Sequence, residues 1–522
     1  MKKYIAAILL FVAWPSFAAD INGYTAQYEC RAGGPNCNVD VATLTAQACQ
    51  QTITTSTTPT NDWSAINFTN QVICIQAGDH TARGRLFISA SGTAGTRKVL
   101  RYTRASDNDD EPWNQSTANK AKLKGLELTG ADYWIIHRLT FDGDGTSAHS
   151  GINFANSSGA TNNIVNRVLV EDYNASLIII GHSGNDNNVI QKSVLRDTRV
   201  AASTTIENQC IALRGGSANK WVVNNEMYNC TKITFAEEGT NPHPGLVIEN
   251  NDAYTTTSRY TDCAGTYTTN GPCADTEGVA FDSKSGSSTS NIGRIIHNRV
   301  WGFRAGDGNF AQAGGGWAVS FSNVTDDFPG SGTDYTLVQN NIIWDMNLAF
   351  WNFYKGPDHN SIIGNLIFDV YDHGGNPPFS RDIGGISTKS LDTTEVYLNT
   401  FINVDPIIDD WGNDTSKDIL CNVFVGGGAA SGSYGSGTEV DRNAFYGVKM
   451  TTTGTTGSNV VYPNISDANM TEYCFNKRLR TGPERVCIPN ARPTNSSPHL
   501  NACDASLGAR RGVGVSDEFP VF

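Results

Sequence analysis

The sequence predicts an all-β protein whose short strands coil repeatedly around one core, a parallel β-helix. One observation is a recurring unit: a β-branched residue, an Asn three positions later and an apolar residue two beyond that. Its period is in the low twenties with occasional insertions, which is typical of a solenoid. The other observation is that each half of the unit has only two to four residues of alternating apolar character, too few for a helix and suited to a strand.

The clearest copy of the unit is residues 335–344, in which Val338, Asn341 and Ile343 hold the three positions. The other copies are Val222/Asn225/Met227, Ile295/Asn298/Val300, Ile362/Asn365/Ile367, Val396/Asn399/Phe401, Ile419/Asn422/Phe424 and Val440/Asn443/Phe445, with a looser one at Val247/Asn250. Asn tolerates left-handed backbone geometry at a bend, and its amide can bond its equivalents in the coils above and below. We therefore expect a structural Asn ladder with no part in catalysis.

The chain divides into four segments. Residues 1–18 have the pattern of a secretory signal peptide, with Lys2 and Lys3, an apolar run over residues 4–12 and a small residue, Ala18, at the cleavage site. Residues 19–80 lack the repeat and are expected to cap the first coil, since the ends of a solenoid need a cap. The helix is expected over residues 81–510, followed by a short tail at 511–522. An exported protein, secreted or periplasmic, is predicted.

Net charge argues against some classes of partner, and cysteine content predicts disulfides. The formal net charge is -13, which argues against a nucleic-acid or anionic-membrane partner, and we expect a monomer. All 12 cysteines follow the signal segment, and an even count in an exported chain favours disulfides. Local pairs are Cys30/Cys37, Cys49/Cys74, Cys210/Cys230, Cys263/Cys273 and Cys474/Cys487, which leaves Cys421 and Cys503. The sequence does not fix the connectivity.

Together with the Asn-bearing coils, two further stretches carry a family resemblance. They are the opening from Gly78-Asp79-His80 to Ser91-Gly92-Thr93, and residues 132–136 followed by 139–141. Over roughly residues 80–510 the chain resembles the right-handed parallel β-helix superfamily typified by pectate lyases and alginate lyases. The resemblance implies three strands in each coil, Asn at the turn between the second and third, and carbohydrate along a groove over the first.

If the Asn turns are placed in this way, the first strands lie just upstream, at residues 151–154, 178–182, 211–214, 233–238, 279–284, 317–321, 350–355 and 386–389. Side chains alternate between the two faces of a strand, so the apolar ones point inward. The outward and strand-end positions then hold His182, Arg214, Glu237, Glu238, Asp282, Lys284, Lys355 and Lys389. On an acidic protein this is a basic row with a carboxylate cluster at its centre.

Such a row suits β-elimination on a uronic-acid polymer. Proton abstraction next to a carboxylate requires that the carboxylate be neutralised, by Arg or by Ca²⁺, and that a base be placed against the carbon acid. We assign Lys284 as base, Arg214 as partner of the substrate carboxylate or of the transition state, and Glu237, Glu238 and Asp282 as candidate Ca²⁺ ligands. Candidate substrate-binding residues are His182, Lys355, Lys389 and Trp351, an aromatic ring that could stack on a sugar.

Residues 277–284 also resemble the stretch of alginate-lyase and chondroitin-lyase β-helices that carries a metal-binding Glu and a catalytic Lys before a Ser. Those families place an Arg-His-Gly on a later strand. Here Arg304-Ala305-Gly306 follows a ladder Asn too soon to be that strand. The family's Arg is therefore unassigned.

Alternatives remain open. A glycoside hydrolase would use two of Glu237, Glu238, Asp282, Asp326 and Asp327, and a non-catalytic adhesin or polysaccharide-binding solenoid would use none. Residues 107–111 could bind calcium but favour a solvated turn, and His243 and His373 are expected to be turn residues. Insertions at 253–276, 302–316 and 371–384 are expected to be long loops on one face that wall the groove.

Overall fold

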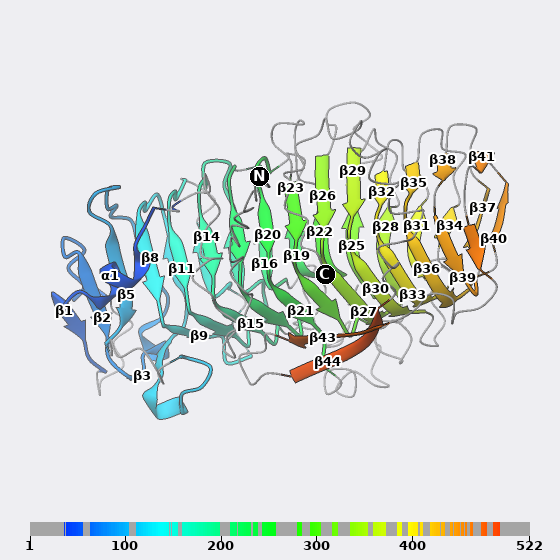
Figure 1. Cartoon of the computed structure of the whole chain (residues 1–522). Coiled ribbons are helices and arrows are strands. Elements are labelled where there is room, and N and C mark those ends of the chain that lie inside the picture. The colour runs from blue at the N-terminus through cyan, green and yellow to red at the C-terminus, as the bar shows by residue number, and fades with distance from the viewer. Residues whose placement is uncertain are drawn as a thin grey trace, which may run out of the picture.

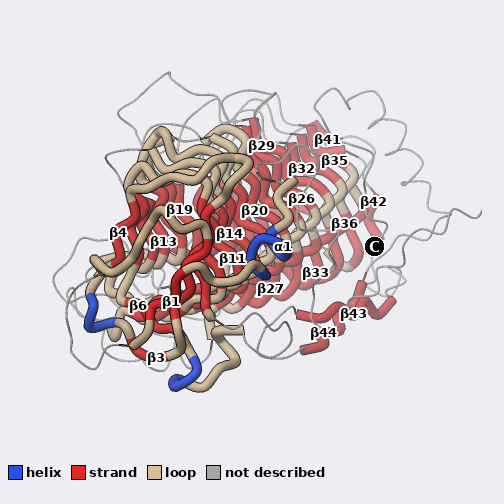
Figure 2. The backbone as a smooth tube through the Cα atoms, turned by 90° about the vertical axis from the view of Figure 1, so that its left-hand side faces the viewer, coloured by secondary structure: helices blue, strands red, loops and turns tan. Residues whose placement is uncertain are grey.

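The computed structural model describes residues 36, 38–55, 63–103, 111–145, 147, 149–154, 159–198, 209–216, 218–230, 233–237, 243–256, 279–283, 293–303, 316–321, 335–352, 359–371, 384–388, 395–405, 408–410, 418–428, 430–433, 439–441, 443–448, 450–453, 455–456, 460–462, 471–477 and 484–490. Within them the strands form three all-parallel sheets, which run side by side along an elongated molecule (Figures 1 and 2). This architecture confirms the predicted parallel β-helix.

Sheet A has 15 strands: β1 (Gln51–Ile53), β2 (Val72–Ile75), β5 (Lys98–Tyr102), β8 (Trp134–His137), β11 (Ile164–Asn166), β14 (Val189–Gln191), β17 (Trp221–Val223), β20 (Val247–Glu249), β23 (Gly293–Ile296), β26 (Tyr335–Gln339), β29 (His359–Ile363), β32 (Glu395–Tyr397), β35 (Asp418–Leu420), β38 (Glu439–Asp441) and β41 (Thr455–Thr456).

Sheet B has 14 strands: β3 (Gly78–Asp79), β6 (Ala121–Leu123), β9 (Thr140–Asp142), β12 (Leu169–Glu171), β15 (Val194–Arg196), β18 (Glu226–Tyr228), β21 (Asp252–Tyr254), β24 (Arg299–Trp301), β27 (Ile342–Met346), β30 (Leu366–Val370), β33 (Thr400–Val404), β36 (Val423–Gly427), β39 (Ala444–Tyr446) and β42 (Val460–Tyr462).

Sheet C has 13 strands: β4 (Leu86–Ile88), β7 (Leu126–Leu128), β10 (Ile152–Phe154), β13 (Ile178–Ile180), β16 (Ile211–Leu213), β19 (Ile233–Glu237), β22 (Val279–Ser283), β25 (Trp317–Phe321), β28 (Leu348–Asn352), β31 (Gly384–Thr388), β34 (Ile408–Asp410), β37 (Ala430–Ser433) and β40 (Met450–Thr453). In chain order the strands run from A to B to C and back to A. Each predicted first strand is a strand of sheet C.

The core is a continuous column of apolar side chains inside the coil. Ile136, Val165 and Ile190 from successive strands of sheet A are fully buried in it, as are Phe141 of sheet B and Phe154 of sheet C. Each coil buries its inward residues against the next, so a solenoid of this length needs no single large core. The alternation of apolar residues in the sequence is the alternation between this column and the outer surface.

The Asn ladder occupies the turn from sheet A to sheet B. In each rung Nδ2 donates to Oδ1 of the Asn one coil further along, at 2.9–3.1 Å. Its members are Asn225, Asn251, Asn298, Asn341, Asn365, Asn399, Asn422 and Asn443. The looser copy predicted at Asn250 was wrong by one residue. Asn250 instead holds the left-handed position just before the rung, with φ 58°.

Two predicted disulfides are present, Cys49–Cys74 and Cys210–Cys230, and the second joins neighbouring coils as expected. Cys474 and Cys487 are register partners in the antiparallel hairpin of β43 (Thr471–Lys477) and β44 (Glu484–Asn490), and Cys421 is disulfide-bonded. Cys30, Cys37, Cys263, Cys273 and Cys503 lie outside the described residues.

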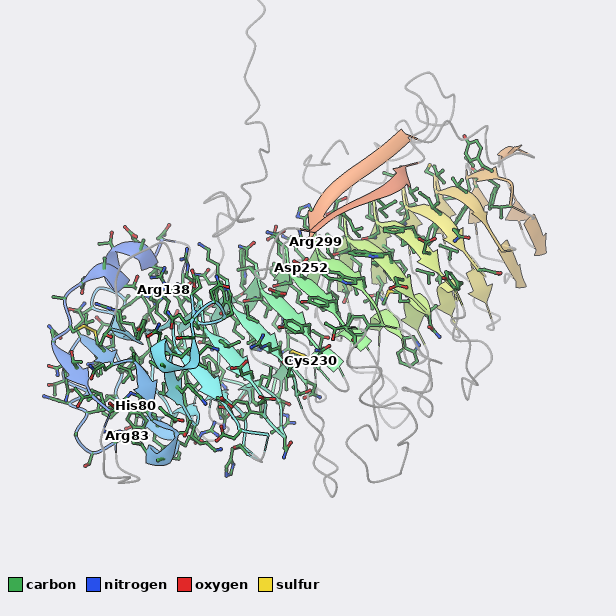
Figure 3. All side chains as sticks on the ribbon, turned by 90° about the horizontal axis from the view of Figure 1, so that it is seen from below. His80, Arg83, Arg138, Cys230, Asp252 and Arg299 are labelled. Carbon is green, nitrogen blue, oxygen red and sulfur yellow. A yellow bond between two sulfur atoms is a disulfide. The ribbon has the colours of Figure 1, made fainter. Side chains whose placement is uncertain are left out.

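The two ends of the helix carry other elements. Strands β1 and β2 already belong to sheet A, so the first strands of the helix lie within the segment expected to be the cap. Near them, α1 (Val41–Ala46) packs Val41 and Leu44 against the outer face of sheet A. The hairpin of β43 and β44 lies along the side of the helix formed by sheet B, near Asp252 and Arg299 (Figures 1 and 3).

The outer face of sheet B carries a column of stacked aromatic rings. Tyr228, Tyr254, Trp301, Trp344 and Phe368 follow one another on successive strands, with ring centroids 4.3–5.6 Å apart. Beside them Arg299 donates to the buried carboxylate of Asp252 (Figure 3). All five rings are buried, so on this face the aromatic side chains pack against one another and are shielded from solvent.

No helix in the described ranges is long and apolar enough to cross a membrane.

Candidate functional site

The three insertions predicted from the sequence all come directly before strands of sheet C in the chain. From β8 to β39, two residues separate each strand of sheet A from the next strand of sheet B. The predicted insertions join β21 to β22, β24 to β25 and β30 to β31, and each therefore leads from sheet B into sheet C. Long loops over a rigid scaffold commonly carry binding and specificity.

The sequence-predicted site residues gather on neighbouring strands of this one sheet. His182 lies two residues after β13, Arg214 directly follows β16, Glu237 ends β19, and Asp282 and Trp351 lie within β22 and β28. These strands belong to a single run in the order β13-β16-β19-β22-β25-β28. Because neighbouring strands are about 4.8 Å apart, Arg214 and Asp282 belong to strands about 10 Å apart. Glu238, Lys284, Lys355 and Lys389 lie outside the described residues.

Strand register separates the two described carboxylate positions. Asp282 is the partner of Ala236 on β19 and of Ser320 on β25. Glu237 is instead the partner of Leu213, a fully buried core residue. Successive positions of a strand belong to opposite faces, so Glu237 and Asp282 do not occupy equivalent positions, although the sequence pattern had grouped them.

Arg214 and His182 are the two predicted cationic residues that lie within the described part of the chain. Arg214 is half-buried, and its backbone N–H donates to the carbonyl of Ile180 at 2.8 Å, which fixes the start of its turn. His182 is also half-buried, and its Nδ1 accepts from the backbone N–H of Gly184 at 2.9 Å. This bond orients the imidazole ring within its own turn. Gly215 packs against His182, because a Cβ on Gly215 would lie 3.1 Å from the carbonyl carbon of His182.

No three His, Cys, Asp or Glu side chains of the described part of the chain are grouped in a way that could hold a metal ion. Glu111, from the acidic run considered as a calcium site, instead accepts from Arg167 at 2.6 Å and lies 3.8 Å from Arg138. Burial raises the pKa of Glu111, and these two guanidinium groups oppose that rise. Glu111 is therefore held in a partly buried ion pair and not in a solvated turn, and residues 107–110 of the same run lie outside the described residues.

One end of the outer face of sheet C has features that the sequence pattern did not single out. Phe87 on β4 is 59% exposed and is the register partner of Glu127 on β7, which is followed by Asn153 on β10. Arg85 lies 3.3 Å from Glu127, and Nη1 of Arg85 donates to the carbonyl of Ser150 at 2.9 Å. Phe87 was visible in the sequence as an outward aromatic residue of an early strand, but only the structure shows that its ring is exposed.

His243, expected to be a turn residue, is a turn residue that is buried. It precedes β20 and is 1% exposed, and its Nδ1 lies 2.8 Å from Nζ of Lys220. His373 lies outside the described residues.

No protein-family model and no curated protein sequence matches this chain. Solved structures similar to it include the pectate lyase Pel9A, at 13% identity over 65% of this chain and 81% of that one, with a TM-score of 0.39. A mannuronic acid specific polysaccharide family 6 lyase from human gut microbiota is 11% identical over 75% and 76%, with a TM-score of 0.32. The catalytic unit of a GH87 α-1,3-glucanase from Streptomyces thermodiastaticus is 13% identical over 76% and 66%, with a TM-score of 0.41. At these values the similarity does not bear on the activity of this chain.

Proposed function

We propose that this protein is an exported polysaccharide lyase that cleaves a uronic-acid polymer by β-elimination on the outer face of sheet C. One observation carries the proposal. Those of the predicted cationic and acidic positions that the structure describes belong to neighbouring strands of a single sheet or directly follow them, and each long insertion leads into a strand of that sheet. A non-catalytic solenoid gives no reason for Arg214 and Asp282 to belong to strands of the same sheet only two coils apart, in the part of the chain that carries these insertions.

In the proposed reaction the polymer lies along sheet C with one uronate over β16 to β22. The guanidinium of Arg214 pairs with the uronate carboxylate and reduces the charge that accumulates when the neighbouring C–H is deprotonated. Lys284 takes that proton, which requires its pKa to be lowered by neighbouring cations. The electron pair then forms the C=C bond as the bond to the leaving sugar oxygen breaks, and that oxygen takes up a proton from water.

Calcium is part of the proposal as an alternative means of neutralising the carboxylate. Carboxylate oxygens are the ligands that Ca²⁺ prefers, and Asp282, Glu237 and Glu238 would supply them. The register of β19 and β22 weakens the pairing of Glu237 with Asp282. We therefore derive no step through the metal. A bound Ca²⁺ would act as a Lewis acid on the carboxylate.

The test is a panel of alginate, pectate and glycosaminoglycans, assayed by the ultraviolet absorbance of the unsaturated product. Wild type is compared with Lys284→Ala and Arg214→Ala, each with calcium and with EDTA. The matched control is Lys122→Ala on sheet B, whose Nζ pairs with Asp142 at 2.8 Å. We expect product from wild type and the control and a loss of at least 100-fold in both site variants, in line with general-base contributions of about 10²–10⁴.

Other outcomes reject parts of the proposal. New reducing ends without ultraviolet absorbance would identify a hydrolase. Binding of a polymer with neither signal would favour a polysaccharide-binding solenoid. Full activity in EDTA would remove calcium from the proposal and leave Arg214 as the carboxylate partner.

A further inference from the structure

A second, shorter Asn ladder runs along the turn from sheet C to sheet A. Asn163 and Asn188 each hold the position directly before a strand of sheet A, and both are buried. Oδ1 of Asn163 accepts from the backbone N–H of Trp134 at 2.8 Å, and Oδ1 of Asn188 accepts from that of Asn163 at 2.9 Å. Their Nδ2 groups donate to the carbonyls of Ala131 and Ala160. At this corner Asn therefore satisfies buried backbone groups.

The next coil has a Lys and not an Asn at the equivalent position. Lys220 takes the position directly before β17 and is 1% exposed. Its Nζ lies 2.8 Å from Nδ1 of His243, which is four residues before β20, the offset that Asn185 has before β14. An ammonium group has no acceptor and cannot repeat the bond that Asn188 makes, and burying a charged group is unfavourable. Where a chain abandons the local structural rule, a functional reason is expected.

The departure occurs in the coils of the candidate site. Lys220 ends the connection between β16 and β17, which starts at Arg214, and His243 lies in the connection between β19 and β20. The Lys220–His243 bond therefore joins the connection that starts at the candidate catalytic residue Arg214 to the connection between β19 and β20. The backbone N–H of Asn219 also donates to the carbonyl of Pro244 at 2.8 Å. The buried contact between Lys220 and His243 is therefore a second bond between the same two stretches of chain.

We propose that Lys220 and His243 are positioning residues, which hold the connection that starts at Arg214 against the connection between β19 and β20. The inference rests on the proposed function. A displacement of about 1 Å in a catalytic arrangement can cost roughly 100-fold in rate. Loss of the pair should therefore reduce turnover, while the polymer, which contacts other coils as well, still binds.

The sequence offers two matched variants. Lys220→Asn installs the residue found at this position in the two preceding coils, and His243→Asn installs the counterpart of Asn185. Each keeps a side chain that suits the ladder and removes the pair. We expect unfolding midpoints within a few degrees of wild type, kcat lowered by about 10- to 100-fold, and KM changed by less than about twofold. The double variant should be no worse than either single one, because residues that act as a unit are not additive.

Hydrogen exchange measured by mass spectrometry over residues 214–220 and 243–246 gives a readout that needs no activity, and both turns should exchange faster in the variants. Asn163→Ala is the control, since it removes a ladder rung away from the pair. It should lower the unfolding midpoint and keep kcat. Wild-type kcat and exchange in Lys220→Asn and His243→Asn would overturn the inference and leave the lyase proposal intact. An inactive wild type would reject the lyase, and exchange would still report whether the pair holds the turns.

Discussion

Replacing Asn341 by Ala in the middle of the Asn ladder should destabilise the helix by an amount that follows from its bonds. Asn341 is 1% exposed. Its Nδ2 donates to the carbonyl of Ile295 at 2.9 Å and to Oδ1 of Asn365 at 2.9 Å. Its Oδ1 accepts from the backbone N–H of Asn298 at 2.8 Å and from Nδ2 of Asn298 at 3.0 Å.

The loss of stability depends on which buried polar groups remain without a partner after the substitution. Nδ2 of Asn298 keeps the carbonyl of Ile248, and Oδ1 of Asn365 keeps the backbone N–H of residue 341. The carbonyl of Ile295 and the backbone N–H of Asn298 both lose the partner that Asn341 provides. Each buried polar group left unpaired costs about 1–3 kcal/mol, so the variant should lose about 2–6 kcal/mol.

The assay is reversible urea unfolding followed by far-ultraviolet circular dichroism, with the free energy taken from the midpoint and the slope. Asn119→Ala is the control, since Asn119 is exposed at the end of a short 3-10 turn, and it should change stability by less than about 0.5 kcal/mol. A loss below about 1 kcal/mol for Asn341→Ala at an unchanged slope would refute the reasoning.

Three further outcomes are expected. Trp301→Ala removes the ring stacked between Tyr254 and Trp344 and should cost about 3–5 kcal/mol in urea unfolding; a loss under about 1 kcal/mol would mean that the column is not packed. Burial, with nearby Arg138, holds the pKa of His137 well below its ordinary value of about 6.5 in the folded state. Below about pH 6.5 the unfolded chain therefore binds a proton at His137 that the folded protein does not, and folding stability falls as pH falls. In thermal scans from pH 8 to 5, the melting temperature of His137→Gln should fall less steeply with acid than that of wild type. An identical fall in the two proteins would contradict this. Phe87→Ala should raise KM by about 2- to 10-fold for long polymers without changing stability, as expected for one lost ring contact; oligosaccharides too short to span the six strand spacings from β4 to β22, about 29 Å, should be unaffected.

The sequence was sufficient to predict the fold because the interactions that specify it are periodic. A coil repeats its contacts with the next coil, so the spacing of Asn341, Asn365 and Asn399 along the chain is the spacing of the rungs. The alternation of apolar residues likewise located the strands of sheet C. One rung was misplaced, at Asn250, because two consecutive Asn residues fit the pattern and only backbone geometry separates the left-handed residue from the ladder residue.

The sequence by itself determined that Arg214, Glu237, Asp282 and Trp351 belong to equivalent strands of different coils of one repeat. Tertiary structure decided what a repeat cannot encode. Register placed Asp282 opposite Ala236 and not opposite Glu237, since a shift of one residue exchanges the two faces of a strand. Folding likewise buried His243, a turn residue as expected, against Lys220, and the sequence did not indicate this contact. Both results depend on contacts between coils in three dimensions, and spacing along the chain does not specify them.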